Sequence, residues 1–194
     1  MSFTEFAWNI FSKSVEDYHL YDNVDYPINN PYESGSLEQL LYAKNWIDTV
    51  QWHLEDIIRD ENIDPVDALN LKRRIDASNQ QRTDLVEYID SWFLQKYQNI
   101  TPKSEAKINT ETVAWAIDRL SILVLKVYHM NQEATRESAS DEHRAKCTEK
   151  LNVLLEQKKD LSQAIDFLLE EIEDRKSTRL NSSHLKLSRM PSSA

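Results

Sequence analysis

Polar side chains interrupt the apolar stripe of a helix that the sequence predicts over residues 64–97. The stripe repeats at steps of three and four and contains Ile75, Asn79, Arg82, Val86, Ile89 and Phe93. A buried guanidinium is tolerated only when it is paired and fully hydrogen-bonded, so Arg82 should face a carboxylate on another helix. The available partners are Asp48, Asp56 and Asp118.

Three interpretations of Arg82 are open from the sequence. A buried ion pair would fix the register between helices, because one polar layer commonly specifies pairing in helical bundles. An anion clamp would instead use the guanidinium to hold a charged ligand. In the third case the stripe is partly exposed, and Arg82 extends its charged head to water.

A mixed stripe on the helix predicted over residues 112–133 carries Asp118, Lys126 and His129. Asp118 and Lys126 lie two turns apart, which is too far for them to satisfy each other, so they need other partners or water. With Arg119, and with Asn79 from the preceding helix, they could line a pocket. Arg and Lys would hold an anion there, while His or Asp would move a proton.

Two histidines occur beside carboxylates at helical spacing. His53 and Asp56 share a helical face, so His53 could be a general base or a metal ligand, although a satisfied core histidine is the commoner case. Glu16 and His19 have the Glu-x-x-His spacing of four-helix di-iron sites, but such a site needs two copies of the motif. Spacing does not show whether His19, His53 and His129 meet, so we predict no metal and no cofactor. The candidate ligand-binding residues are His19, His53, Asp56, Asn79, Arg82, Asp118, Arg119, Lys126 and His129.

The composition excludes several classes of protein. The single glycine, Gly35, excludes the glycine-rich loops that bring backbone amides close to phosphates. The 33 acidic residues exceed the 23 basic ones, which argues against binding to nucleic acid. The lone Cys147 cannot form an internal disulfide, and the longest aliphatic run, 122–125, is too short to span a membrane. We therefore expect an acidic, cytoplasmic protein.

Helical periodicity covers nearly all of the remaining chain. Helices are predicted at about 4–20, 36–60, 64–97, 112–133 and 140–173, with Ser36 and the pair Asp64-Pro65 as start signals. No segment alternates with the period of a strand. The expected fold is all-α, an elongated antiparallel helical bundle of about five helices with no sheet, formed by residues 1–173 as one domain.

The last predicted helix carries a heptad seam that could form a coiled coil with a partner or a second copy. The seam contains Leu151, Leu154, Lys158, Leu161, Ile165, Leu168 and Ile172.

The carboxyl end has a sequence of a different kind. DRKSTRLNSSH (174–184) and SRMPSSA (188–194) look like the translation of a common sequencing adapter, at the spacing that the adapter requires. We therefore expect residues 174–194 to be a non-native, disordered tail that replaces the natural carboxyl end. Deleting them should leave the helical content and the melting temperature unchanged.

Five long runs carry a family resemblance. They are DNVDYPINNPY (22–32), NWIDTVQWHLEDIIRD (45–60), LKRRIDASNQQRTDLVEYID (71–90), INTETVAWAIDRLSILVLKVYHM (108–130) and KLNVLLEQKKDLSQAIDFLLEEIE (150–173). Together they make residues 1–173 resemble the bacterial domain-of-unknown-function family 4254. The resemblance implies an origin in Bacteroidetes and, more loosely, gene neighbourhoods with cell-envelope sugar transferases. Members usually carry Ser-Pro where this chain has Thr112 and Val113, so a proline-started helix is lost here.

Two function classes follow, and the sequence leaves open whether the protein is an enzyme. The first is a non-enzymatic interaction or assembly protein, linked through the resemblance to cell-envelope glycan synthesis, that binds a protein partner or its own copy. The alternative is a small-molecule-binding protein or an enzyme that acts on an anionic or sugar-containing ligand. Neither class involves nucleic acid or a membrane span.

Overall fold

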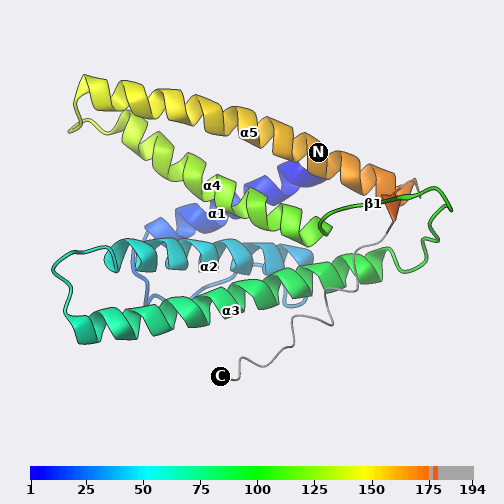
Figure 1. The fold of residues 1–194 in the computed structure, drawn as a ribbon, viewed down its shortest axis with the longest axis horizontal. Helices are drawn as coiled ribbons and strands as arrows, with labels where there is room; N and C mark the ends of the chain where they lie inside the picture. Colours follow the sequence, from blue (N-terminus) through cyan, green and yellow to red (C-terminus); the bar gives the residue numbers. More distant parts are fainter. Residues whose placement is uncertain (175–176, 179–194) are drawn as a thin grey trace.

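The computed structural model describes residues 1–174 and 177–178, and most of them lie in five helices (Figure 1). The helices are α1 (Phe3–His19), α2 (Leu37–Ile57), α3 (Pro65–Lys96), α4 (Val113–Thr135) and α5 (Asp141–Glu173). The all-α prediction is confirmed. None of the described helices combines the length and the apolar character that crossing a membrane requires.

Each helix begins at a residue whose side chain accepts a backbone N–H from the first turn. The capping residues are Ser2, Ser36, Asp64, Thr112 and Ser140. At the start of α4, the Thr112 side chain accepts the N–H of Trp115.

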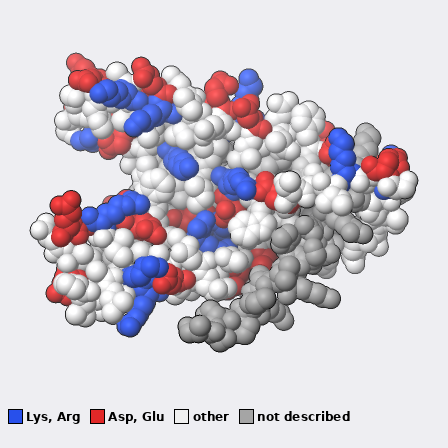
Figure 2. Space-filling model, viewed as in Figure 1, with Lys and Arg blue, Asp and Glu red and all other residues white. Residues whose placement is uncertain are grey.

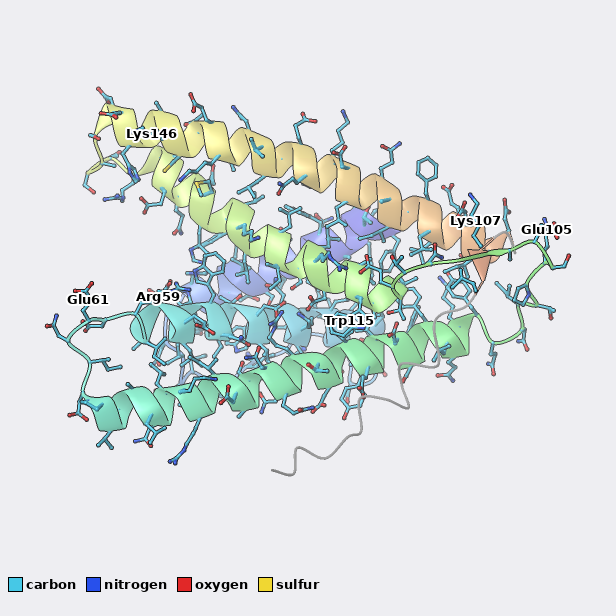
Figure 3. The ribbon with its side chains drawn as sticks, viewed as in Figure 1. Arg59, Glu61, Glu105, Lys107, Trp115 and Lys146 are labelled. Atoms are coloured by element: carbon cyan, nitrogen blue, oxygen red, sulfur yellow. The ribbon has the colours of Figure 1, made fainter. Side chains whose placement is uncertain are left out.

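Two antiparallel helical hairpins and one further helix make up the bundle. α2 pairs with α3, α4 pairs with α5, and α1 packs against both α2 and α4. In Figure 1, α1, α2 and α4 run in one direction, and α3 and α5 run in the other. The hairpins diverge towards the end that holds the α2–α3 and α4–α5 connections, and Figure 2 shows a notch between them there. Figure 3 places Glu61 and Lys146 at this diverging end, and Glu105 and Lys107 at the opposite end.

The main core lies where all five helices meet. Its fully buried side chains include Phe11, Ile89, Phe93, Ile117 and Leu120. A smaller apolar cluster of Leu54, Leu71 and Ile75 joins α2 to α3 at the diverging end. Burial of these apolar surfaces supplies most of the stability of the helices, which are otherwise amphipathic and polar.

Most apolar residues of the α5 heptad seam pack against the other helices of the same chain. Ile165 and Ile172 are buried in the main core, and Leu161 and Leu168 pack against it. Leu151 and Leu154 are half-buried. The apolar side chains that α5 leaves exposed are Val153, Leu155 and Phe167.

The structure contains one short strand pairing that was not predicted, and its first strand lies within the segment 98–111 that was expected to be a loop. Residues of β1 (Lys107–Ile108) pair in parallel with those of β2 (Ser177–Thr178). An extended backbone exposes unpaired N–H and C=O groups, and a second extended segment satisfies them. The pairing is two residues long and leaves the fold class unchanged. Residues 175–176 and 179–194 lie outside the described residues, so the disorder and the foreign origin of the tail stay predictions.

Candidate functional site

A buried layer of charges joins α2, α3 and α4. The Arg82 side chain, 23% exposed, donates to Asp48 Oδ1 at 2.5 Å and to Asp118 Oδ1 at 3.3 Å. Lys44 is fully buried and contacts the same two carboxylates, at 2.5 Å from Asp48 Oδ2 and 2.7 Å from Asp118 Oδ1. Two cations and two anions therefore neutralise each other within the bundle.

Neutral polar groups complete this charged layer. The Ser121 hydroxyl donates to Asp48 Oδ2 at 2.6 Å, and the Asn45 amide donates to the Ser121 hydroxyl at 3.0 Å. The fully buried Asp48 thus has three partners: Lys44, Arg82 and Ser121. Such complete satisfaction is what makes buried charges tolerable.

The geometry supports the interpretation of Arg82 as a structural pair. The guanidinium already contacts two carboxylates, and the adjacent hollow of about 180 Å³ is lined by Gln51, Trp52 and Glu55, among other residues. A further anion there would have to compete with Asp48 and Asp118. Lys44 was not among the sequence candidates, although its spacing of four residues from Asp48 is a signal for an ion pair on one helix.

Of the remaining anion-binding candidates, Asn79 stays beside Arg82, whose Nη1 donates to Asn79 Oδ1 at 3.5 Å, whereas Asp56, Arg119 and Lys126 have other neighbours. Asn79 accepts a hydrogen bond from the Gln51 amide at 2.7 Å, and Asp56 pairs with Arg59 at 2.6 Å on the surface. Arg119 on α4 pairs with Glu111, which precedes the helix. The groove of about 580 Å³ between α4 and α5 is lined by Asp118, Arg119 and Lys126, among other residues. The candidates therefore divide among separate places in the fold.

The three histidine candidates do meet. His19, His53 and His129 lie in the C-terminal halves of α1, α2 and α4, and each offers a ring nitrogen within 4.8 Å of the others. His19 Nε2 and His53 Nε2 are 3.2 Å apart. Because α1, α2 and α4 run in the same direction, their C-terminal halves lie towards the same end of the molecule (Figure 1).

The hydrogen bonds of the histidines place ring nitrogens inside the cluster, where His19 Nε2 and His53 Nε2 lie within hydrogen-bond distance of each other. His19 Nδ1 lies 2.7 Å from the Val15 carbonyl oxygen, to which it can only donate, so in the neutral ring Nε2 carries a lone pair. His129 Nε2 is buried and has no hydrogen-bond partner among the described residues. A buried ring nitrogen without a partner is rare enough to require an explanation.

Aromatic neighbours hold two of these imidazole rings in place. Trp52 stacks on His129 at a centroid distance of 5.1 Å, and Tyr18 stacks on His53 at the same distance. Fixed rings are what a preformed ligand site requires, because the rotamers need no reordering when the ligand binds.

Burial and the proximity of neighbouring imidazoles favour the neutral forms of His53 and His129. Burial, reinforced by nearby His19 and His53, lowers the pKa of His129 to about 4. Burial and the proximity of His19 also lower the pKa of His53. A neutral imidazole is the form that binds a metal ion, so these shifts favour coordination at neutral pH.

Acid should destabilise the metal-free protein through His129. Its pKa in the folded state, about 4, lies below the ordinary value of 6.5, so the unfolded chain binds more protons between these pH values. The contribution of neutral His129 to stability is therefore present above pH 6.5 and is lost as the pH falls towards 4. Urea titrations across this range, with a chelator present, should show a shallower decline for His129→Gln than for the wild type. An unchanged pH profile in this variant would contradict the assignment, and the exposed His143 provides the control His143→Gln.

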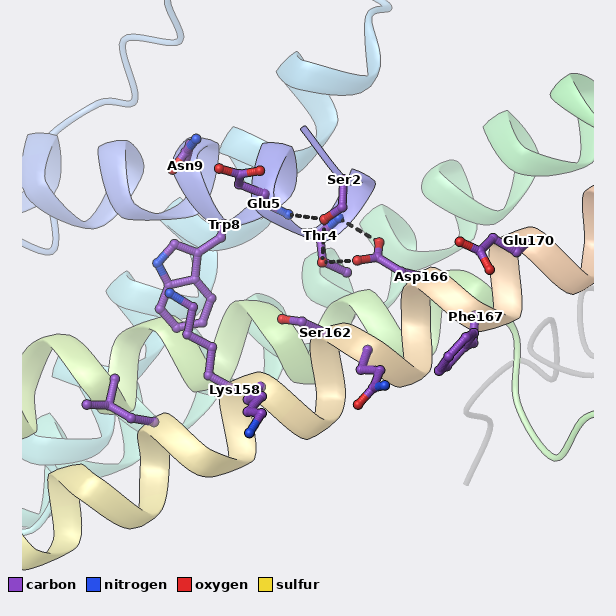
Figure 4. A pocket seen from close by; sticks show the side chains of 13 residues that line it. Ser2, Thr4, Glu5, Trp8, Asn9, Lys158, Ser162, Asp166, Phe167 and Glu170 are labelled. Atoms are coloured by element: carbon purple, nitrogen blue, oxygen red, sulfur yellow. Dashed lines mark hydrogen bonds between the residues drawn. The ribbon is translucent and has the colours of Figure 1, made fainter.

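A separate groove of about 670 Å³ lies between α1 and α5 (Figure 4). Lys158 Nζ lies 3.8 Å from the centroid of a Trp8 ring. Asp166 accepts hydrogen bonds from the Thr4 N–H at 3.0 Å and the Thr4 hydroxyl at 2.6 Å. These contacts hold the start of α1 against α5, and the residues lining the groove include none of the nine candidates.

Residues 38–180 match a family described as "Protein of unknown function (DUF4254)". No curated protein and no solved structure shows a significant match to the chain. The matched stretch contains His53 and His129, whereas His19 precedes it on α1.

Proposed function

Since this chain belongs to DUF4254, a family of proteins of unknown function, we propose a function from its own geometry: it binds a divalent transition-metal ion. The ligands are His19, His53 and His129. The observation that carries the proposal is the approach of three imidazole nitrogens from three helices to within 4.8 Å of one another.

The spacing of the nitrogens fits a metal ion. Zinc–imidazole bonds of about 2.0–2.1 Å in a tetrahedral site place ligand atoms about 3.3 Å apart. The 3.2 Å between His19 Nε2 and His53 Nε2 matches that spacing. The nitrogen that His129 offers lies within 4.8 Å of the other two, so all three rings could contribute to one site.

The surroundings support the same function. The Val15 carbonyl orients the His19 ring from its other nitrogen, as the second shell of a metal site does. A bound ion would also give the buried His129 Nε2 its missing partner. Three imidazoles suit Zn²⁺, Cu²⁺, Ni²⁺ and ferrous iron better than Mg²⁺ or Ca²⁺, which prefer oxygen ligands.

This proposal belongs to the second class from the sequence, the small-molecule-binding proteins and enzymes, although the sequence predicted no metal. The first class, an interaction or assembly protein linked to envelope glycan synthesis, stays a prediction. The heptad seam that favoured it packs largely inside the fold. Bacterial origin and cytoplasmic location also stay predictions.

Calorimetric titration of the chelator-treated protein with Zn²⁺ tests the proposal. One ion should bind per chain, and each of His19→Ala, His53→Ala and His129→Ala should weaken binding by roughly 100-fold or more, because each removes a direct ligand. Stoichiometric binding of unchanged affinity in the His129→Ala protein would contradict it.

A matched control is available on α5. His143 lies 2.9 Å from Glu133 Oε2 and 3.4 Å from Cys147 Sγ, away from the three-histidine cluster. His143→Ala should leave zinc affinity unchanged. Loss of binding in this variant would place the ion at His143 and would exclude the three-histidine site.

A further inference from the structure

The proposed metal site concerns three protein ligands, and the neighbouring carboxylate of Asp22 bears on what else the ion could bind. Resting on that site, we infer that the ion keeps one coordination position open beside Asp22, and that Asp22 selects uncharged hydrogen-bond donors over anions as the exchangeable ligand.

The number of protein ligands points to an open position. Structural zinc sites use four protein ligands, whereas sites that exchange a ligand use three and leave the fourth place to water or substrate. Within the described residues, the group of mutually close donor atoms consists of His19, His53 and His129 alone. In the part of the chain that the structure describes, no fourth histidine, cysteine or carboxylate joins this group.

Asp22 lies beside the cluster without belonging to it. Its Oδ1 is 3.9 Å from His53 Nε2, but the carboxylate is not part of the group whose atoms all lie within 4.8 Å of one another. That distance leaves room for a small ligand on the ion that donates a hydrogen bond to the carboxylate. The Asp22 side chain is 66% exposed, so a molecule from solvent can reach this side.

The backbone holds Asp22 at this place. The residue follows the end of α1 with a left-handed φ of 47°, a conformation that Asp adopts more readily than most residues. Its N–H donates to the Tyr18 carbonyl at 2.9 Å and closes the end of the helix. The carboxylate is thus three residues from His19 along the chain and is positioned by the same helix.

The charges around the cluster select against anions. Asp22 and Asp56 both act electrostatically on His53 and His129, and Glu16 and Asp22 act on the neighbouring Tyr128. Arg59 pairs with Asp56 at 2.6 Å. An anion on the open position would therefore be repelled by the negative charge of Asp22, whereas an uncharged N–H or O–H donor could donate a hydrogen bond to its carboxylate.

Cobalt provides the direct measurement, because the visible spectrum of Co²⁺ changes when its coordination changes. We would load the protein with Co²⁺ and titrate it separately with imidazole, above the pKa of imidazole itself, and with azide. Imidazole should change the spectrum at lower concentration than azide. In Asp22→Asn the ratio of the two dissociation constants should shift by about tenfold towards azide, because the repulsive charge is gone.

Asp25 serves as the matched control, because it lies in the same loop and pairs with Arg74 at 2.7 Å. Asp25→Asn should leave the ratio unchanged. An unchanged cobalt spectrum with both ligands would overturn the open position, and an equal shift in the two variants would overturn the role of Asp22. Failure of Co²⁺ to bind would instead overturn the proposed metal site and this inference with it.

Discussion

Replacing Lys44 with methionine should lower the free energy of unfolding by about 3 to 5 kcal/mol, because the change removes one cation from a buried, balanced set of four charges. Asp48 and Asp118 would then share Arg82 alone, and the excess negative charge would lie inside the bundle. Urea denaturation followed by circular dichroism measures this loss directly. A change below 1 kcal/mol would show that water reaches the layer.

The variant Arg82→Met provides a comparison for the loss expected in Lys44→Met. Arg82→Met should destabilise the protein roughly half as much, because the side chain keeps 23% exposure and solvent screens the charges near it. Adding Asp118→Asn should recover much of that loss by restoring the balance of charge. A nearly neutral effect of Arg82→Met alone would favour the anion clamp.

Zinc should stabilise the folded protein by about 4 kcal/mol when its free concentration is about 1,000-fold above the dissociation constant. The ion binds the native arrangement of three helices far better than it binds the unfolded chain, where the histidines are separate. Thermal melts in zinc buffers should therefore show a melting temperature that rises with free zinc.

His129→Ala removes a ligand and should abolish the zinc-dependent rise. His143→Ala should retain it. A melting temperature independent of zinc, in protein shown by calorimetry to bind the ion, would mean that the unfolded chain binds it equally well.

Local signals predicted the helices well. Ser36 and Asp64 accept the first-turn amides as their residue types and positions indicated. These features depend on a few neighbouring residues, so the sequence alone carries them. The short pairing of Lys107 and Ile108 with residues 177–178 depends on distant segments, and no local pattern indicated it.

Contacts across helices were predicted only in part. Asp48 and Asp118 do pair with Arg82, but Asp56 lies two turns beyond Asp48 along α2 and pairs with Arg59 instead. Helical spacing shows which face a residue occupies, but it does not show which turn of a neighbouring helix lies opposite.

The same limit hid Lys44 and the histidine cluster. A lysine is usually exposed, and Lys44 is buried only because Asp118 arrives from α4 beside Asp48. Likewise, His19, His53 and His129 come from three helices, and their shared end depends on the common direction of α1, α2 and α4.

The divergence of the two hairpins gives the histidine cluster a mechanical consequence. His53 belongs to the α2–α3 hairpin, His129 belongs to the α4–α5 hairpin, and His19 lies on α1, which packs against both. An ion coordinated by all three histidines would connect the α2–α3 hairpin, the α4–α5 hairpin and α1 near the end where the hairpins diverge. If the proposed ion binds there, it would link the two hairpins at this end of the bundle and oppose their separation.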